Sequence, residues 1–296
     1  MAEEGIISSL IQARYGYGAS SASSSISSAS VIQATSAISP SPTLEILLRH
    51  KSVRNFLPQK LPEGSLEAII AAAQSAATSS NLQTWSVVAI QDPENKEKAA
   101  TLCGDQDFIR QAPLFLIFCA DLNRLTKVSE QHGLRGEGLE FTEMFLMASL
   151  DAGLAGQNAT VAAEALGLGA CYVGAARNRP VELAELLRLP ERVFALFGVA
   201  VGIPDLEQPA AKIKPRLPQR EVLHWESWAR KDSQGDEQAE NLKSYDVTLA
   251  SFNAGEKREG VPAWTQRSAR RIETVESLHG RHVLKDVLQQ NGFQLR

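Results

Sequence analysis

The sequence contains little cysteine, little excess charge and no long apolar run. Its 296 residues include three cysteines and carry a formal net charge of −4 at pH 7. The cysteines are far apart and form no CxxC pair, which disfavours a disulfide framework or a metal site and favours a reducing, cytoplasmic compartment. The small net charge disfavours nucleic acid as a partner. No apolar run reaches the roughly 18 residues of a membrane span, so no membrane association is expected.

The cysteine positions also bear on catalysis. Cys103, Cys119 and Cys171 each lie beside or within an apolar stretch. A lone cysteine can act as a nucleophile, but a thiol in an apolar stretch is more typical of a small buried side chain. We therefore predict three buried structural thiols.

The first 42 residues differ in composition from the rest of the chain. Eight of the eleven residues from 20 to 30 are serine, and residues 39–42 read Ser-Pro-Ser-Pro. Such a stretch has too little large apolar surface to offset the entropy cost of ordering it, so residues 1–42 are predicted to form a disordered tail. The alternative is a transit peptide for organellar import, which two early glutamates and the single basic residue Arg14 disfavour.

The rest of the chain alternates apolar runs with helical patterns. Strands are predicted at residues 85–90, 114–120, 171–174 and 195–202, and helices at residues 43–48, 62–73, 95–102 and 139–166. Strands separated by helices indicate a layered α+β or α/β domain, which we place at residues 43–228. The helix at 139–166 is apolar around most of its circumference, which indicates burial in a core or a subunit interface. Residues 229–296 form a polar C-terminal region with helices expected at 239–252 and 265–290.

Two short basic motifs lie more than 150 residues apart, at residues 50–54 and 214–218. In an extended segment alternate side chains share a face, so His50, Ser52 and Arg54 would project together, as would Lys214 and Arg216. Two such clusters that meet in a fold would suit an anion such as phosphate, because charge-assisted hydrogen bonds to phosphate are strong. Taken alone, a motif of this kind is more often a solvated loop than an anion site.

Six motifs, taken in order, resemble those of the FMN-dependent nitroreductases. They lie at residues 50–54, 77–83, 104–106, 167–174, 177–178 and 214–218. The branch they resemble contains the oxygen-insensitive NADPH nitroreductases and the NADPH:FMN oxidoreductases. The resemblance implies a nitroreductase-like α+β fold, with a central, mostly antiparallel sheet flanked by helices and a C-terminal helical excursion over residues 229–296 that packs on the domain or on a partner subunit.

The resemblance also implies roles for individual residues. The residues implied to hold the FMN phosphate are His50, Ser52, Lys214 and Arg216. Those implied to contact the ribityl chain or the ring are Arg54, Thr78, Ser79, Ser80, Gln83, Gln106, Tyr172, Val173, Gly174 and Arg281. Arg54 would place a positive charge at the N1–O2 edge of the ring, and Gly174 would direct its backbone N–H toward N5. Arg258 matches one cation of a pair that holds the NADPH 2′-phosphate.

Several of these residues have simpler interpretations. His50 and Ser52 could mark a helix end, residues 78–80 a helix-ending turn, and Gly174 close packing of strands. The chain also departs from the family pattern: Ala175 stands where members often have glycine, and Asn81 where they commonly have an aromatic residue. The second cation of the NADPH pair falls at Ala254, so the preference for NADPH over NADH rests on the branch.

The resemblance implies a two-electron, ping-pong oxidoreductase. NADPH would reduce the bound FMN, and a small-molecule acceptor such as a nitroaromatic, a quinone or a free flavin would then take the two electrons. Members are homodimers with FMN at the interface, and a homodimer is expected here. Two alternatives stay open: a flavin reductase that supplies reduced FMN to a partner monooxygenase, and a flavin-binding protein without turnover.

Overall fold

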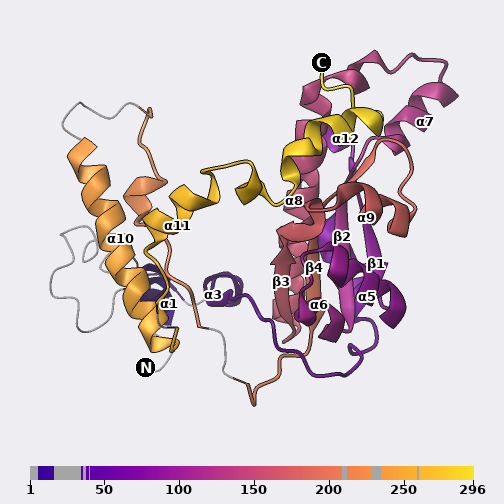
Figure 1. Cartoon of the computed structure of the whole chain (residues 1–296). Helices are drawn as coiled ribbons and strands as arrows, with labels where there is room; N and C mark the ends of the chain where they lie inside the picture. Colours follow the sequence, from indigo (N-terminus) through magenta and orange to yellow (C-terminus); the bar gives the residue numbers. More distant parts are fainter. Residues whose placement is uncertain are drawn as a thin grey trace. The chain divides into compact units, whose positions relative to one another are not determined.

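The computed structural model describes residues 6–16, 35, 38–39, 41–208, 212–228, 235–258 and 260–296. The chain divides into two compact units (Figure 1): unit 1 comprises Met1–Lys51 and Ala211–Ser277, and unit 2 comprises Ser52–Ala210 and Leu278–Arg296. These limits differ from the domain boundaries that composition suggested at residues 43 and 229. Within the described ranges, no helix combines the length and the apolar character needed to cross a membrane.

Unit 2 is built on a four-stranded sheet. Its strands are β1 (Trp85–Ile90), β2 (Leu114–Asp121), β3 (Gly169–Val173) and β4 (Val193–Gly202), in the order β1-β2-β4-β3. Every pairing is antiparallel. The four predicted strands are therefore confirmed to within a few residues at each end. The antiparallel sheet with flanking helices also confirms the predicted α+β class.

Helices cover both faces of this sheet. The helices on one face are α5 (Pro93–Leu102), α6 (Asp107–Gln111) and α9 (Pro180–Leu187), and those on the other are α4 (Ser65–Gln74) and α8 (Thr142–Ala165). All of β2 is buried, and its side chains alternate between the two cores: Phe115 and Ile117 face the first, while Leu116 and Phe118 face the second. A strand that is buried on both faces explains why this segment is a continuous apolar run.

The long helix α8 accounts for most of the helix predicted at 139–166. A short 3-10 turn, Glu137–Glu140, precedes it, and the backbone at Phe141 is extended. One side of α8 packs on the sheet through small residues such as Ala152, Ala155 and Ala159, which are buried. Three leucines on the opposite side of this helix, described below, are about half exposed. Within this chain, the expected burial therefore holds for the side of α8 that faces the sheet.

Unit 1 contains the helices α1 (Ile6–Tyr15), α3 (Pro42–Arg49), α10 (Gly235–Gly255) and α11 (Trp264–Arg271). Helix α1 packs on α3 and buries Ile7 and Leu10. This is a correction, because α1 lies within residues 1–42, where we predicted a disordered tail. The serine-rich stretch of that tail lies outside the described residues.

Several helix boundaries also differ from the prediction. Helix α3 begins at Pro42, one residue before the predicted start, and is capped by Ser41, whose Oγ accepts from the Leu44 N–H at 3.4 Å. The helix expected at 265–290 is divided into α11 and α12 (Leu284–Gln290). The division is explained by His279 and Gly280, whose φ angles of 52° and 84° are left-handed and incompatible with a continuous helix. Helix α7 (Asn123–Gln131) was not predicted, nor were α6 and α9.

Candidate functional site

Three of the predicted phosphate-binding residues belong to unit 1. His50 follows the last turn of α3 and is half-buried, while Lys214 and Arg216 are exposed on an irregular segment. Arg14 of α1 links the two segments: its Nη1 donates to the Lys214 carbonyl at 3.1 Å, and its Nη2 donates to the His50 carbonyl at 2.9 Å. Unit 1 thus brings the backbones of both basic motifs to one arginine.

The segment between Lys214 and Arg216 is fixed from a second side. Pro215 is buried, and its carbonyl accepts from the Tyr245 hydroxyl of α10 at 2.9 Å. The Arg216 N–H donates to the Arg14 carbonyl at 2.8 Å. Burial raises the pKa of Tyr245, and the charge of Arg216 opposes that rise, which places this cation near the phenol. The two cations of the motif therefore stand on a segment held by α1 and α10.

Ser52 and Arg54 belong to unit 2 and lie along β3. Ser52 forms a parallel bridge with Ala170, and the Val53 N–H donates to the Ala170 carbonyl at 2.9 Å. Burial raises the pKa of the Cys171 thiol, while the charge of Arg54 and a hydrogen bond with Ser52 act in the opposite direction. Ser52 and Arg54 therefore both influence the Cys171 thiol. Residues 52 and 53 are thus paired with β3, whereas His50, the first residue of the same motif, belongs to unit 1.

Arg54 also contacts helix α6, which begins directly after Gln106. The guanidinium carbon of Arg54 lies 5.8 Å from the centre of the Phe108 ring, which is within the range of a cation–π contact. Gln106 is half-buried, and its Nε2 donates to the Cys103 carbonyl at 2.8 Å. The predicted ring-edge cation and the predicted pyrimidine-edge amide thus flank the same short helix.

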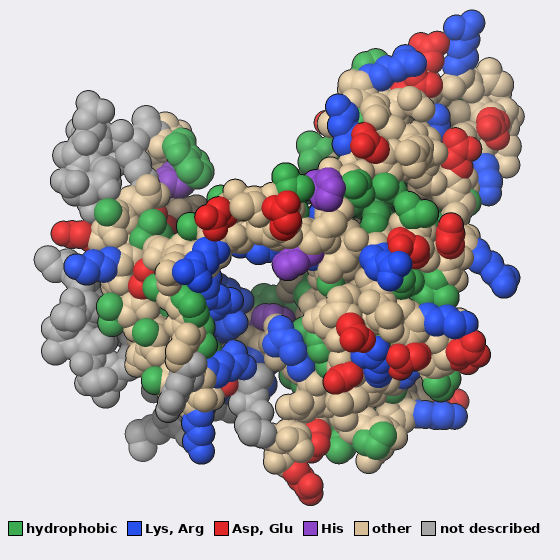
Figure 2. Space-filling model, in the orientation of Figure 1, with side chains coloured by type: hydrophobic (Ala, Val, Ile, Leu, Met, Phe, Trp, Pro, Cys, Tyr) green, Lys and Arg blue, Asp and Glu red, His purple; other side chains and the backbone are tan. Residues whose placement is uncertain are grey.

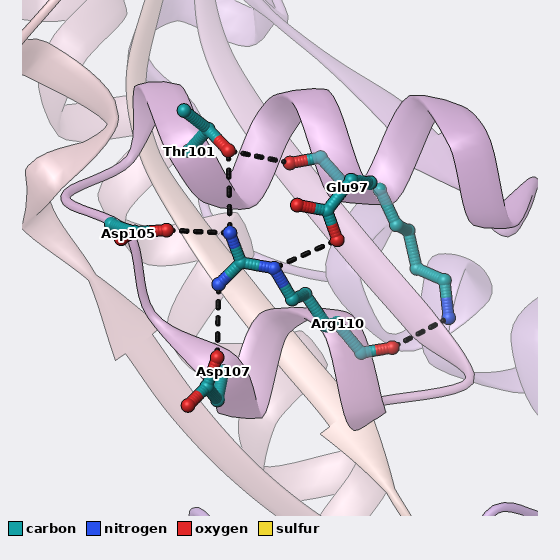
Figure 3. Close-up of polar contacts among 6 residues, drawn as sticks. Glu97, Thr101, Asp105, Asp107 and Arg110 are labelled. Atoms are coloured by element: carbon teal, nitrogen blue, oxygen red, sulfur yellow. Dashed lines mark hydrogen bonds and ion pairs between the residues drawn. The ribbon is translucent and has the colours of Figure 1, made fainter.

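Arg110 fixes the turn that presents Gln106 (Figure 3). It donates to Asp105 at 2.5 Å and to Asp107 at 3.0 Å, on either side of Gln106 in the sequence. It also pairs with Glu97 of α5 at 2.8 Å. Hydrogen bonds to Glu97 and Asp105 raise the pKa of the Arg110 guanidinium, so this residue stays charged. One planar side chain therefore ties both neighbours of Gln106 to α5.

The predicted residues 172–174 lie where β3 ends, at Val173, and a 3-10 turn begins, at Gly174. Val173 is buried in the core, whereas Tyr172 is 36% exposed. A Cβ on Gly174 would meet only the Nη2 of Arg177, at 3.6 Å. The space next to Gly174 is therefore open to a bound group, rather than filled by a neighbouring strand.

Three chain segments meet at Ala175 and Asn178, directly after Gly174, and we refer to residues 104–106, 174–178 and 280–281 as the ring-side cluster. A Cβ on Gly104 would lie 3.3 Å from the Cβ of Ala175 and 3.9 Å from the Nε2 of Gln106. Arg281 donates from Nε to the Oδ1 of Asn178 at 2.9 Å. Gly280 adopts a left-handed φ of 84°, and a Cβ there would come within 2.9 Å of the Asn178 carbonyl. The cluster thus places the predicted cation Arg281 against Asn178, after the 3-10 turn that follows β3.

The hydroxyl-rich turn at residues 78–83 is anchored on α8. Asp151, which is buried, accepts from the Thr78 hydroxyl at 2.6 Å and from the Ser79 N–H at 3.0 Å. The Thr78 Oγ1 in turn accepts from the Gln83 N–H at 3.0 Å, so this hydroxyl is used within the turn. The exposed residues of the turn are Ser79, Ser80, Asn81 and Gln83. Three of them, Ser80, Asn81 and Gln83, have positive φ angles, a strained arrangement that is common at functional sites.

The remaining predictions concern Arg258 and the three cysteines. Arg258 is exposed just after α10 in unit 1, and its N–H donates to the Asn253 carbonyl at 2.9 Å. The three thiols are buried, as predicted. Burial raises the pKa of Cys103 and of Cys119 to about 12, so neither thiol is a nucleophile near neutral pH.

The distribution of charge differs between the units (Figure 2). Lys and Arg side chains gather along one border of unit 1, whereas acidic and basic side chains are interspersed over the visible face of unit 2. A local concentration of cations in a chain of net charge −4 is what an anion-binding segment requires.

Sequence reasoning missed four residues that shape the site: Arg14, Arg110, Asp151 and Asn178. Asn178 was part of a motif but received no role. Arg110 had a detectable signal, because it follows Asp107 by three residues, a spacing that brings side chains together on a helix. Arg14 and Asp151 act on residues far away in the sequence, and nothing local pointed to their partners.

Comparison with known proteins bears out the resemblance. The nitroreductase family model matches residues 47–203, and the model of the nitroreductase family C-terminal domain matches residues 214–296. The FMN reductase (NADPH) of Bacillus subtilis is 35% identical over 255 residues, which cover 85% of this chain and 98% of that protein. The oxygen-insensitive NADPH nitroreductase of Salmonella typhimurium is 39% identical over 212 residues, or 72% and 82% of the two chains.

Structural similarity leads to the same result. The solved structure of the hypothetical oxidoreductase YcnD from Bacillus subtilis superimposes with a TM-score of 0.80 at 35% identity, and covers 87% of this chain and 100% of that one. Helix α1 lies outside the residues that match the two family models. With both models matched and relatives aligned over most of their length, the chain belongs to the nitroreductase family.

Proposed function

We propose that this protein is an FMN-dependent oxidoreductase that transfers two electrons from NADPH, in preference to NADH, to nitroaromatics, quinones or flavins. The observation that carries this proposal is the ring-side cluster, whose three contacting segments carry the Gln106 amide, the Arg281 cation and the open backbone at Gly174. The activities named for the relatives, FMN reductase (NADPH) and oxygen-insensitive NADPH nitroreductase, support it.

The residues present in each unit fit the chemistry of FMN. In unit 2, Gly174 leaves room for a flat ring, and the Gln106 amide can both donate to and accept from the edge of a pyrimidine. In unit 1, His50, Lys214 and Arg216 can balance the charge of a phosphate dianion. FMN, when bound, supplies the two-electron chemistry, and the protein binds, orients and tunes it.

The protein residues act mainly through charge and orientation. Arg54, held against Phe108, would stabilise negative charge that develops at the nearby edge of the ring. The half-buried Arg177 beside Gly174 donates to the Leu196 carbonyl, and burial lowers its pKa. We assign no general acid to the protein, because water can supply the protons that reduction of the acceptor consumes.

The test is the visible spectrum of the purified protein. We expect bound-flavin bands that bleach on anaerobic addition of NADPH, more slowly with NADH, and that return when a nitroaromatic or a quinone is added. The Arg216→Ala variant should lose most of its FMN on purification, because one phosphate contact is removed. A colourless protein that takes up no added FMN would refute the assignment.

The same experiment separates the two alternatives. Flavin that binds but does not bleach with any nicotinamide coenzyme would favour a binding protein without turnover. Reduced FMN that leaves the protein, measured by filtration under anaerobic conditions, would favour a flavin reductase that supplies a monooxygenase. Retention of reduced FMN during turnover of a quinone supports the oxidoreductase that we propose.

We also propose that the protein is a homodimer. Leu146, Leu150 and Leu154 of α8 are 52%, 59% and 48% exposed. Their spacing of four residues places them on one side of the helix. A row of half-exposed leucines is typical of a surface that a second subunit covers. The occupant we infer is a second copy of this chain, and its test is given in the Discussion.

A cytoplasmic location is proposed on the basis of the thiols. Cys103, Cys119 and Cys171 are all free, which suits a reducing compartment. The relatives named above are bacterial proteins and do not bear out organellar import. Fractionation of cells that produce the full chain should recover the protein with soluble cytoplasmic markers, and recovery with organelle or membrane markers would contradict the proposal.

A further inference from the structure

Arg14 occupies an unusual position in unit 1. It lies on α1, and its guanidinium donates to three main-chain carbonyls: Leu48 at 2.8 Å, His50 at 2.9 Å and Lys214 at 3.1 Å. These carbonyls belong to the two segments that carry the basic motifs, which are more than 150 residues apart in the sequence. One half-buried side chain therefore sets the spacing between the two segments.

The connection is reciprocal. The Arg14 carbonyl accepts from the Arg216 N–H at 2.8 Å, so both the backbone and the side chain of Arg14 engage the second motif. Gly16, at the end of α1, has a φ of +70°, and a Cβ there would lie 3.5 Å from Pro215 and would collide with the Thr248 methyl group of α10. The end of α1 is thus pressed against the same segment. Ile7 and Leu10, both buried, hold the rest of the helix in place.

The orientation of the three carbonyls matters electrostatically. A peptide carbonyl carries partial negative charge on its oxygen and repels a nearby anion. Because the oxygens of Leu48, His50 and Lys214 point at Arg14, the negative ends of these dipoles are neutralised by a guanidinium. Arg14 also adds a full positive charge next to His50, Lys214 and Arg216, and this charge favours a dianion at these residues.

We propose that Arg14 is a positioning residue for the FMN phosphate: it holds the His50 and Lys214–Arg216 segments at the separation that binds the dianion. This inference rests on the proposed function. Arg14 lies outside the residues that match the nitroreductase family models, so the device belongs to the N-terminal helix of this chain. Helix α1, expected to be disordered, then has a defined task.

The test compares FMN with riboflavin, which has the same ring and ribityl chain but no phosphate. Both are titrated into the full-length apoprotein, and binding is followed by the quenching of flavin fluorescence. Arg14→Ala should weaken FMN binding by about tenfold or more, because hydrogen bonds that involve a charged group are lost, and should leave riboflavin binding unchanged. Arg14→Lys should be intermediate, because an ammonium keeps the charge but lacks the planar fork.

Arg49→Ala is the matched control. Arg49 lies directly before His50 and pairs with Glu45 of the same helix at 3.7 Å. The Arg49→Ala substitution removes one positive charge from the same unit, as Arg14→Ala does, but leaves the hydrogen bonds to the three carbonyls intact. The preference for FMN over riboflavin should therefore be kept. Circular dichroism and thermal melting establish that each variant is folded. If Arg14→Ala does not fold, the FMN-to-riboflavin affinity ratio of Arg14→Lys decides.

The outcomes are distinguishable. Unchanged FMN affinity in folded Arg14→Ala, or an equal loss for FMN and riboflavin, would overturn the positioning role while leaving the oxidoreductase proposal intact. A wild-type protein that binds riboflavin as tightly as FMN would overturn the phosphate site itself, and Arg14 with it. A loss confined to FMN in Arg14→Ala but absent from Arg49→Ala supports the inference.

Discussion

At the scale of single residues, the shape of the hydroxyl-rich turn depends on one buried carboxylate. Asp151 accepts from Thr78 and Ser79, and also from the N–H and the hydroxyl of Thr84, at 3.3 and 2.9 Å. A buried carboxylate is costly unless hydrogen bonds replace its water, and four donors do so here. The positive φ angles that follow Ser79 are tolerated because both ends of the turn are fixed to α8.

Replacing Asp151 by asparagine tests this anchoring. The amide keeps the size of the side chain, but its NH₂ group cannot accept from the donors that face it. We expect the free energy of unfolding to fall by about 3 kcal/mol, measured by urea denaturation, because buried donors are left unpaired. Asp286→Asn, at an exposed position of α12, should change it by less than about 0.5 kcal/mol. Equal stability of the two variants would show that the turn does not depend on Asp151.

At the scale of elements, the link between α5 and α6 determines how Gln106 is presented. Arg110 reaches Glu97, Asp105 and Asp107 at once, which only a planar group with several donors can do. Arg110→Lys should therefore loosen the turn before α6. Because FMN and riboflavin share the ring, both should bind more weakly, by about three- to tenfold.

This pattern distinguishes Arg110→Lys, which should weaken the binding of both flavins, from Arg14→Ala, which should weaken the binding of FMN alone. Arg135→Lys is the control. Arg135 is exposed, and it forms a local ion pair at 3.3 Å with Glu137, two residues further along the chain. Flavin titration of the two lysine variants gives the comparison. If Arg110→Lys binds both flavins as the wild type does, the turn before α6 is rigid without the arginine.

The strands and helices also show how much of the fold could be predicted from the sequence. The strands were predictable because a segment buried on both faces must be continuously apolar, as β2 is. Helix α1 was not, because its few large apolar residues precede a long serine-rich stretch and composition was averaged over both. The break before α12 carried a signal in Gly280 that a helical pattern on both sides concealed.

The sequence was sufficient to identify the motifs of the candidate site. It did not reveal the residues that hold those motifs in place. His50, Ser52, Arg54 and Gln106 lie in short patterns whose chemistry can be interpreted locally. Arg14, 36 residues from His50 and 200 from Lys214, acts through the backbone of both residues. Such contacts depend on the tertiary fold, and no spacing in a single sequence reveals them.

At the scale of the whole molecule, the outer side of α8 determines the expected assembly. The inner side is occupied by the sheet, while Leu146, Leu150 and Leu154 remain about half exposed. Burying one leucine contributes about 1.5 kcal/mol, and a repeated contact in a twofold dimer counts twice. We therefore expect light scattering of the wild type to give twice the chain mass of 32.1 kDa.

A charge in the middle of this row should break the dimer. Leu150→Glu replaces apolar contact by a carboxylate that must be desolvated without a partner, so the dissociation constant should rise by about 100-fold or more. Leu134→Glu is the control, because Leu134 is 66% exposed and lies outside α8. Light scattering coupled to size exclusion should find a monomer only for Leu150→Glu. A wild type that is monomeric at every concentration, or a Leu150→Glu variant that stays dimeric, would exclude this side of α8 as the interface.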